Sequence, residues 1–344
     1  MTRWYSVYFH FSKLTIFSSF LRVLDKQVIS FIFVRAMMIL TNCEGRVGVN
    51  KAREVLINNG SSLDAIEQGI RLIEADTTID SVGRGGSPNL LGEMECDAAI
   101  MDGSNLLAGS IGALKDYLHA ISVARAVMEK LPHVMLVGEG AHQFAQEINA
   151  EKADMLSDEA RIKHEKWIRE NVSTDDMKNW PNVSLAKYAW LSGKDYASGG
   201  TVVFLAIDAK ENIVAGTSTS GWARSYPGRL GDSPIIGAGL YADNRYGACA
   251  CTHNGEMTIR TSTARSVILY MKKGASVKEA CNEAMRDLLY LHEGQIGAVV
   301  IHAIDKNGNA CVVSSHDLKE KSSYYLWKDE MKSIEHKQAE VIKL

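Results

Sequence analysis

One long apolar segment in the second half of the chain most constrains the fold. Residues 199–207 begin with two glycines and Thr201 and continue as six apolar residues, Val-Val-Phe-Leu-Ala-Ile. Such a run predicts a buried strand. Residues 213–216, Ile-Val-Ala-Gly, follow a short polar turn and predict the hairpin partner of that strand.

The rest of the chain alternates strand and helix patterns. Strand-like segments precede helix-like segments in each half, which predicts helices packed outside a mainly antiparallel, layered core. The predicted strands cover residues 38–40, 97–101, 133–137, 248–252, 297–303 and 310–314, and the predicted helices cover residues 51–58, a segment from 61 onward, 120–130, 264–271 and 277–289.

Charge and cysteine content limit the classes of partner. The chain has 344 residues, with 38 Lys and Arg against 41 Asp and Glu. Without an excess of either sign, nothing in the overall charge favours nucleic acid or a membrane surface, and a small neutral or zwitterionic ligand fits better. Six scattered cysteines without a C-x-x-C pair argue against a disulfide framework and favour a reducing, cytoplasmic compartment.

Two segments depart from the regular pattern. Residues 1–37 are aromatic and basic, with no apolar stretch long enough for a membrane span and only a weak match to a signal peptide. We treat them as an N-terminal extension of unclear status, which leaves a secreted or lysosome-like location open. Residues 151–198 are charged and predict an exposed, mobile linker.

The common catalytic signatures are missing. The chain has no phosphate-binding G-x-x-x-x-G-K-[ST], no H-E-x-x-H and no G-x-S-x-G. Cys249 and Cys251 form only a C-x-C within a strand of small residues, so we expect no metal site and no cofactor. What remains is a concentration of threonines and charges between residues 199 and 256. Taken singly, each motif is explained by the preference of Thr for strands and of Gly for turns.

Taken together, these motifs resemble a family. Gly200-Thr201 opening a strand, Gly-Thr-Ser-Thr-Ser-Gly at 216–221 and Gly-Arg-Leu-Gly-Asp-Ser-Pro at 228–234 are similar to the threonine-dependent asparaginases. These comprise glycosylasparaginases and isoaspartyl peptidase/L-asparaginases, which are N-terminal nucleophile hydrolases. The first half is similar too, for example in Gly-Gly-Ser-Pro-Asn at 85–89. The resemblance covers about residues 38–315.

The resemblance implies an α+β fold, a four-layer αββα sandwich that cuts itself between Gly200 and Thr201. One structural domain would then consist of an α-subunit half, residues 38–200, and a β-subunit half, residues 201–344. The cut gives Thr201 a free α-amino group, whose ordinary pKa of about 7.7 to 8.0 suits proton transfer at neutral pH. Glycosylasparaginases usually carry His-Asp before this threonine, whereas this chain has Gly199-Gly200.

The resemblance also implies roles in turnover. Thr201 is the nucleophile that attacks the side-chain carbonyl of an asparagine-like substrate, and Thr219 lies beside it and orients or polarises it. Arg229 binds the α-carboxylate of the substrate and Asp232 binds its α-amino group. The oxyanion is bound by the Thr252 hydroxyl and the backbone N–H of His253. The family commonly has glycine where this chain has His253.

Three hypotheses about activity stay open. The chain hydrolyses glycosylated asparagine, or it is an isoaspartyl peptidase/L-asparaginase, or it is an uncut, inactive relative. The start of the first strand, Leu-Thr-Asn-Cys-Glu-Gly at 40–45, lacks the tryptophan of glycosylasparaginases and favours the second hypothesis. The segment Tyr-Ala-Asp at 241–243 favours the first. By the same resemblance we expect a homodimer of cut protomers.

Overall fold

The long apolar segment forms strand β5, Val202–Ile207, in which all six residues are buried. Strand β5 lies inside an eight-stranded sheet with the order β12-β11-β1-β5-β6-β2-β3-β4. This computed structural model describes residues 37–192, 200–294 and 296–342. The predictions for residues 1–36 and for the end of the linker at 193–198 therefore lie outside the described residues.

The predicted hairpin of β5 with β6, Ile213–Thr219, is confirmed as an antiparallel pair. On its other side β5 pairs antiparallel with β1, Met38–Asn42. The neighbours along this sheet are also antiparallel, apart from the parallel pair of β3 with β4. The remaining strands of this sheet are β2 (Cys96–Asp102), β3 (Ala108–Leu114), β4 (Met135–Val137), β11 (Ser323–Lys328) and β12 (Glu335–Gln338).

A second sheet has five strands in the order β13-β10-β9-β8-β7. Its central pairs are antiparallel, and the short β13 adds to β10 in parallel. The segments predicted as strands at 297–303 and 310–314 overlap β9 and β10, which form an antiparallel hairpin. The strands are β7 (Leu240–Asp243), β8 (Gly247–His253), β9 (Val299–Asp305), β10 (Ala310–Ser314) and β13 (Glu340–Val341).

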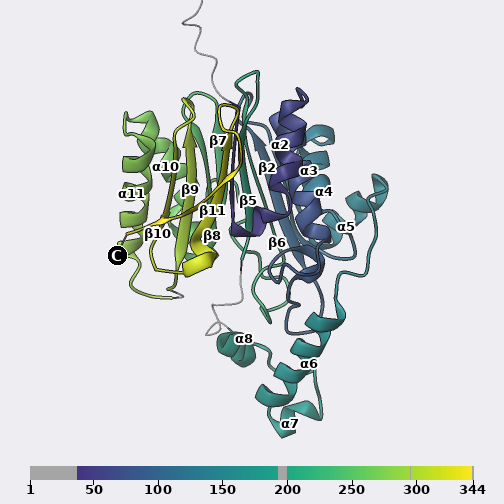
Figure 1. Ribbon diagram of the computed structural model, residues 1–344. Coiled ribbons are helices and arrows are strands. Elements are labelled where there is room, and N and C mark those ends of the chain that lie inside the picture. Colours follow the sequence, from purple (N-terminus) through teal and green to yellow (C-terminus); the bar gives the residue numbers. More distant parts are fainter. Residues whose placement is uncertain (1–36, 193–199, 295, 343–344) are drawn as a thin grey trace, which may run out of the picture. The chain divides into compact units, whose positions relative to one another are not determined.

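Helices cover the outer faces of the two sheets (Figure 1). Four helices pack against the eight-stranded sheet: α2 (Val49–Ile57), α3 (Ser62–Ala75), α4 (Ala120–Lys130) and α5 (Gly138–Glu147). Two pack against the five-stranded sheet: α10 (Thr263–Lys272) and α11 (Val277–Asp287). Helix α9 (Gly255–Thr261) follows β8. Side-chain caps begin several of them. Ser61 accepts from the Asp64 N–H at the start of α3, and Ser276 with Glu279 forms a capping box on α11.

Three apolar clusters hold these elements together. One joins the helices α2–α5 to the eight-stranded sheet, one lies between the two sheets, and one joins the five-stranded sheet to α10 and α11. The expectation of helices outside a mainly antiparallel layered core is therefore confirmed, and the described residues form a mixed α+β structure with two sheets. No helix within the described ranges has the length and apolar character that crossing a bilayer requires.

The segment predicted as a linker contains more regular structure than its charge pattern indicated. It holds α6 (Asp158–Asn171), α7 (Thr174–Met177) and α8 (Ala186–Ser192). Ile168, Val172 and Tyr188 bury a small apolar cluster with Leu90 from the first half of the chain. A cluster assembled from such widely spaced residues leaves no periodic signal, which is why the pattern suggested a linker.

Candidate active site

The candidate nucleophile lies at the start of β5. Thr201 is buried, and the side chain of Asn42 at the end of β1 anchors its backbone. Asn42 Nδ2 donates to the Thr201 carbonyl oxygen at 2.6 Å, and Asn42 Oδ1 accepts from the Val203 N–H at 3.1 Å. Because β1 and β5 are paired strands, the sheet itself fixes where Thr201 sits.

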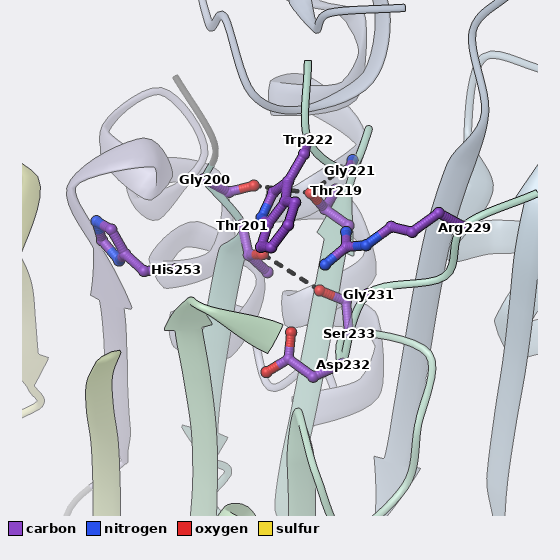
Figure 2. Close-up of a pocket in the computed structure, with 10 residues that line it drawn as sticks. All are labelled: Gly200, Thr201, Thr219, Gly221, Trp222, Arg229, Gly231, Asp232, Ser233 and His253. Atoms are coloured by element: carbon purple, nitrogen blue, oxygen red, sulfur yellow. Dashed lines mark hydrogen bonds between the residues drawn. The ribbon is translucent and has the colours of Figure 1, made fainter. Parts of the chain in front are cut away.

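The carbonyl before Thr201 accepts a hydrogen bond from the other predicted threonine. Thr219 Oγ1, at the end of β6, donates to the Gly200 carbonyl oxygen at 2.7 Å (Figure 2). The Gly221 N–H in turn donates to Thr219 Oγ1 at 3.1 Å. We expected Thr219 to act on Thr201. In the uncut chain its hydroxyl instead polarises the carbonyl of the bond that would be cut.

The hydroxyl of Thr201 contacts a residue that the sequence did not single out. Thr201 Oγ1 lies 3.2 Å from Ser233 Oγ, and both side chains are buried. Ser233 is held in place because its carbonyl oxygen accepts from Thr217 Oγ1 on β6 at 2.8 Å. Its only sequence signal is its position directly after Asp232.

The candidate carboxylate-binding residue is already paired in this structure. Arg229 donates through Nε and Nη2 to the Glu256 carboxylate at 2.9–3.0 Å. Its guanidinium carbon also lies 4.2 Å from the centre of the Trp222 ring. The hydrogen bonds to Glu256 and the stacked ring of Trp222 fix the plane of the guanidinium. A substrate carboxylate would meet a positively charged group that is held in one orientation.

Asp232 is the buried acidic group of the site. Thr258 Oγ1 donates to Asp232 Oδ2 at 2.7 Å. Burial raises the pKa of Asp232 to about 6, although the Thr258 bond and the charge of Arg229 act in the opposite direction. An ammonium group placed beside this carboxylate would favour its charged form.

Thr252 and His253 end strand β8. Thr252 Oγ1 lies 2.9 Å from His253 Nδ1, so its hydroxyl is engaged with its neighbour. Removal from water lowers the pKa of His253 to about 4, which keeps the ring neutral at physiological pH. His253 has a φ of 81°, a conformation that favours glycine. This backbone accounts for the glycine that the family commonly has here.

These residues surround one small pocket. It is lined by Gly200, Thr201, Thr219, Gly221, Trp222, Arg229, Gly231, Asp232, Ser233 and His253. In Figure 2 Thr201 lies between His253 and Arg229. The structure thus brings together every predicted site residue except Thr252, which precedes His253 on β8 and does not line the pocket. The cavity volume of about 10 Å³ has room for roughly one water molecule, not for an amino acid.

Within the described part of the chain, His, Cys, Asp and Glu side chains nowhere form a group of three that could hold a metal ion. The pocket itself offers the hydroxyls of Thr201, Thr219 and Ser233, together with the Arg229 cation, the Asp232 carboxylate and the His253 ring. This set suits acyl transfer to a hydroxyl nucleophile with recognition of a charged amino-acid end.

A family model described as asparaginase matches residues 46–333. The chain belongs to the asparaginase family. The resemblance inferred from its motifs is thereby confirmed, and the family consists of amidohydrolases. The match includes every residue that lines the pocket and all strands of the two sheets except β1, β12 and β13.

Individual members of the asparaginase family are similar over most of their length. The N(4)-(beta-N-acetylglucosaminyl)-L-asparaginase of Elizabethkingia miricola is 37% identical over 270 residues, covering 76% of this chain and 74% of that protein. The protein of that name from Rattus norvegicus is 34% identical over 273 residues, covering 74% and 78%. The plant-type L-asparaginase of Pyrococcus furiosus is 35% identical over 282 residues, covering 81% and 87%.

Proposed function

We propose that this chain cuts itself between Gly200 and Thr201 and then hydrolyses the side-chain amide of an asparagine-type substrate, as a glycosylasparaginase. Its two sheets with outer helices would be the four-layer αββα sandwich of an N-terminal nucleophile hydrolase. The observation that carries the proposal is the hydrogen bond from Thr219 Oγ1 to the Gly200 carbonyl oxygen, directly beside the Thr201 hydroxyl.

Self-cleavage follows from that geometry. The Thr201 oxygen attacks the Gly200 carbonyl carbon, and the negative charge that develops on the Gly200 oxygen is stabilised by Thr219. The carbon–nitrogen bond breaks as the proton of the hydroxyl reaches the nitrogen, which leaves an ester. Water then opens the ester to give a Gly200 carboxylate and a Thr201 with both a free hydroxyl and a free amine.

In turnover the new amine serves as the base for its own hydroxyl. Thr201 attacks the amide carbon of the substrate side chain, and the carbon–nitrogen bond breaks as the Thr201 ammonium gives its proton to the leaving nitrogen, which departs as an amine or ammonia. Water then hydrolyses the remaining β-aspartyl ester to aspartate and free Thr201. Arg229 binds the α-carboxylate and Asp232 the α-amino group. Thr252 and the N–H of His253 stabilise the oxyanion, which requires the Thr252 hydroxyl to turn from His253 Nδ1. The released Gly200 end leaves the pocket, which makes room for the substrate.

The leaving group decides between two activities. The names of the relatives from Elizabethkingia miricola and Rattus norvegicus support removal of the N-acetylglucosamine-amine from asparagine. The plant-type relative supports the alternative of an isoaspartyl peptidase/L-asparaginase, and so does the start of the first strand, residues 40–45, which lacks the tryptophan of glycosylasparaginases. In either case we propose a homodimer of cut protomers.

The deciding experiment is the intact mass of the purified protein under denaturing conditions, followed by assays on glycosylated asparagine, β-aspartyl dipeptides and asparagine. We expect two chains that meet between residues 200 and 201. Thr201→Ala should give one uncut chain without amidase activity, because it removes the nucleophile of both reactions. A full-length mass that persists on incubation of the wild-type protein would support the inactive relative instead.

A further inference from the structure

A carboxyl group from the first half of the chain occupies the space beside Gly200. Glu44 belongs to a short 3-10 helix, Cys43–Arg46, that directly follows β1. A Cβ atom added to Gly200 would lie 2.7 Å from Glu44 Oε1 and 2.7 Å from Ser81 Oγ. No side chain fits at position 200 without displacing one of them. Glu44 therefore places its carboxyl where a side chain of residue 200 would otherwise lie.

The Glu44 carboxyl is also connected by hydrogen bonds to Thr201, on the other side of the Gly200–Thr201 peptide bond. Asn42 Nδ2 donates both to Glu44 Oε2 at 2.5 Å and to the Thr201 carbonyl oxygen at 2.6 Å. Cys43 Sγ donates to Glu44 Oε2 at 2.9 Å. These bonds occupy Oε2 and leave Oε1 as the oxygen that faces Gly200. Glu44 thus lies against the Cβ position of Gly200 and is linked to the Thr201 carbonyl through the side-chain amide of Asn42.

The surroundings of Glu44 suit proton transfer. Burial raises its pKa above the ordinary value for glutamate. The groups that face it are the Cys43 thiol, the Lys321 ammonium group, which lowers the pKa, and the Asp80 carboxylate, which raises it. The residue is half-buried, so it can exchange protons with water.

Self-cleavage needs a base that turnover does not. Before the cut the Thr201 nitrogen is an amide and cannot take up a proton, so the hydroxyl requires another acceptor. The ionisable side chains that line the pocket are engaged elsewhere: Asp232 with Thr258, Arg229 with Glu256 and His253 with Thr252. Glu44 is the ionisable group whose carboxyl lies against the Cβ position of Gly200.

We propose that Glu44 is the acid–base residue of self-cleavage, an inference that rests on the proposed function. As a carboxylate, Glu44 takes the proton of Thr201 Oγ1 while that oxygen bonds to the Gly200 carbonyl carbon. It gives the proton to the Thr201 nitrogen as the carbon–nitrogen bond breaks. The step ends with an ester, an amine and a carboxylate, so Glu44 is regenerated. Water then hydrolyses the ester.

The first test compares cleavage rates on denaturing gels for freshly purified precursor. Glu44→Gln keeps the size and the bond from Asn42 but cannot accept the proton, and we expect cleavage at least about 100-fold slower. Glu44→Asp should recover part of the rate. Glu320→Gln, which removes an exposed carboxylate near Cys43, is the matched control and should cut at the wild-type rate.

The second test uses pH and leaves Glu44 in place, so it holds even if the Glu44 variants do not fold. The wild-type cleavage rate should fall as pH falls through the pKa of Glu44, because only the carboxylate is a base. Asp80→Asn should move this fall to lower pH and Lys321→Gln to higher pH, since both residues are exposed and act on Glu44 by charge.

The outcomes separate the two proposals. A wild-type precursor that never cuts overturns the proposed function, and the role of Glu44 with it. A wild-type precursor that cuts, beside a folded Glu44→Gln that cuts within twofold of it, overturns only the role of Glu44. If the pH at which the cleavage rate falls is the same in Asp80→Asn and Lys321→Gln as in the wild type, the role of Glu44 is also overturned.

Discussion

His253 is a non-glycine residue held at a φ of 81°, which costs free energy in the folded state. Replacing it with glycine should relieve that cost. We expect His253→Gly to be more stable than His253→Ala by about 1 kcal/mol, since both variants lose the ring and its bond to Thr252, and only glycine removes the strain. Denaturant midpoints of the two variants measure the difference. Equal midpoints would show that the backbone there is unstrained.

Binding of the substrate α-carboxylate by Arg229 should depend on the planar shape of its guanidinium group as well as on its charge. Its Nε and Nη2 bind Glu256 while its face stacks on Trp222, and lysine can reproduce neither contact. We therefore expect Arg229→Lys to raise the KM about tenfold or more with a smaller change in kcat. Steady-state kinetics on the substrate that proves active test this prediction. An unchanged KM would mean that another group binds the α-carboxylate.

At the scale of single residues, the sequence predicts only those site residues that belong to a motif resembling the family. Thr201, Thr219, Arg229 and Asp232 were identified by resemblance, and all four line one pocket. Ser233 and Glu256 were not assigned a role, because their contacts depend on how the segment after β6 folds back against β5 and α9. Nothing in the local pattern of either residue distinguishes it from an ordinary polar side chain.

Among the elements, β9 contains the least expected side chain. His302 pairs across the strands with Ala250 and Val312, which belong to the cluster between the two sheets, so its ring faces that apolar layer. It is 1% exposed, and neither ring nitrogen has a hydrogen-bond partner among the described residues. Burial, with a smaller effect of His253, lowers its pKa to about 3.

This histidine should make the molecule sensitive to acid. The unfolded chain binds a proton at His302 below pH about 6.5 while the folded chain does not until about 3, so stability falls as pH falls across that window. The wild type should lose about 1.4 kcal/mol per pH unit relative to His302→Leu between pH about 6 and 4.

Urea unfolding at several pH values, on wild type and variant together, measures this difference. Groups without an effect on the pKa of His302, such as Asp232, titrate in both proteins and cancel in the comparison. Parallel stability curves for the two proteins would show that His302 is hydrated or hydrogen-bonded in solution.

The bounds of elements whose apolar residues repeat with a clear period were predicted closely. Helix α4 was expected at 120–130 and occupies Ala120–Lys130, because its apolar face repeats regularly and Pro132 follows its end. The three separate helices α6–α8 were not predicted, because α6 is mostly charged and buries only two of its residues. Such helices depend on contacts with distant segments, here Leu90, which no local window includes.

At the scale of the whole molecule, the proposed cut would divide strands that are interleaved. In the eight-stranded sheet β1 lies between β11 and β5, while β6 pairs with β2. Strands β1 and β2 belong to residues 1–200, and β5, β6 and β11 belong to residues 201–344. Separating the two fragments would break three antiparallel ladders and open the apolar clusters on both faces of this sheet.

We therefore expect the cut protein to remain one particle. Native mass spectrometry should give the sum of the two fragments, or a multiple of that sum, whereas denaturing separation gives the fragments singly. The uncut Thr201→Ala protein is the matched control and should have the same native mass apart from the added water and the CH₂O that the substitution removes. Fragments that separate on dilution without denaturant would contradict this account of the sheet.

The position of β11 next to β1 also sets the order of events during synthesis. Strand β1 is among the first described residues to leave the ribosome, yet one of its two neighbours, Ser323–Lys328, is among the last. The bond before Thr201 is held by Asn42 from the early part and by Thr219 from the later part. Strand β1 gains this neighbour only after residues 323–328 have left the ribosome, so the sheet around the proposed cut cannot be complete before then.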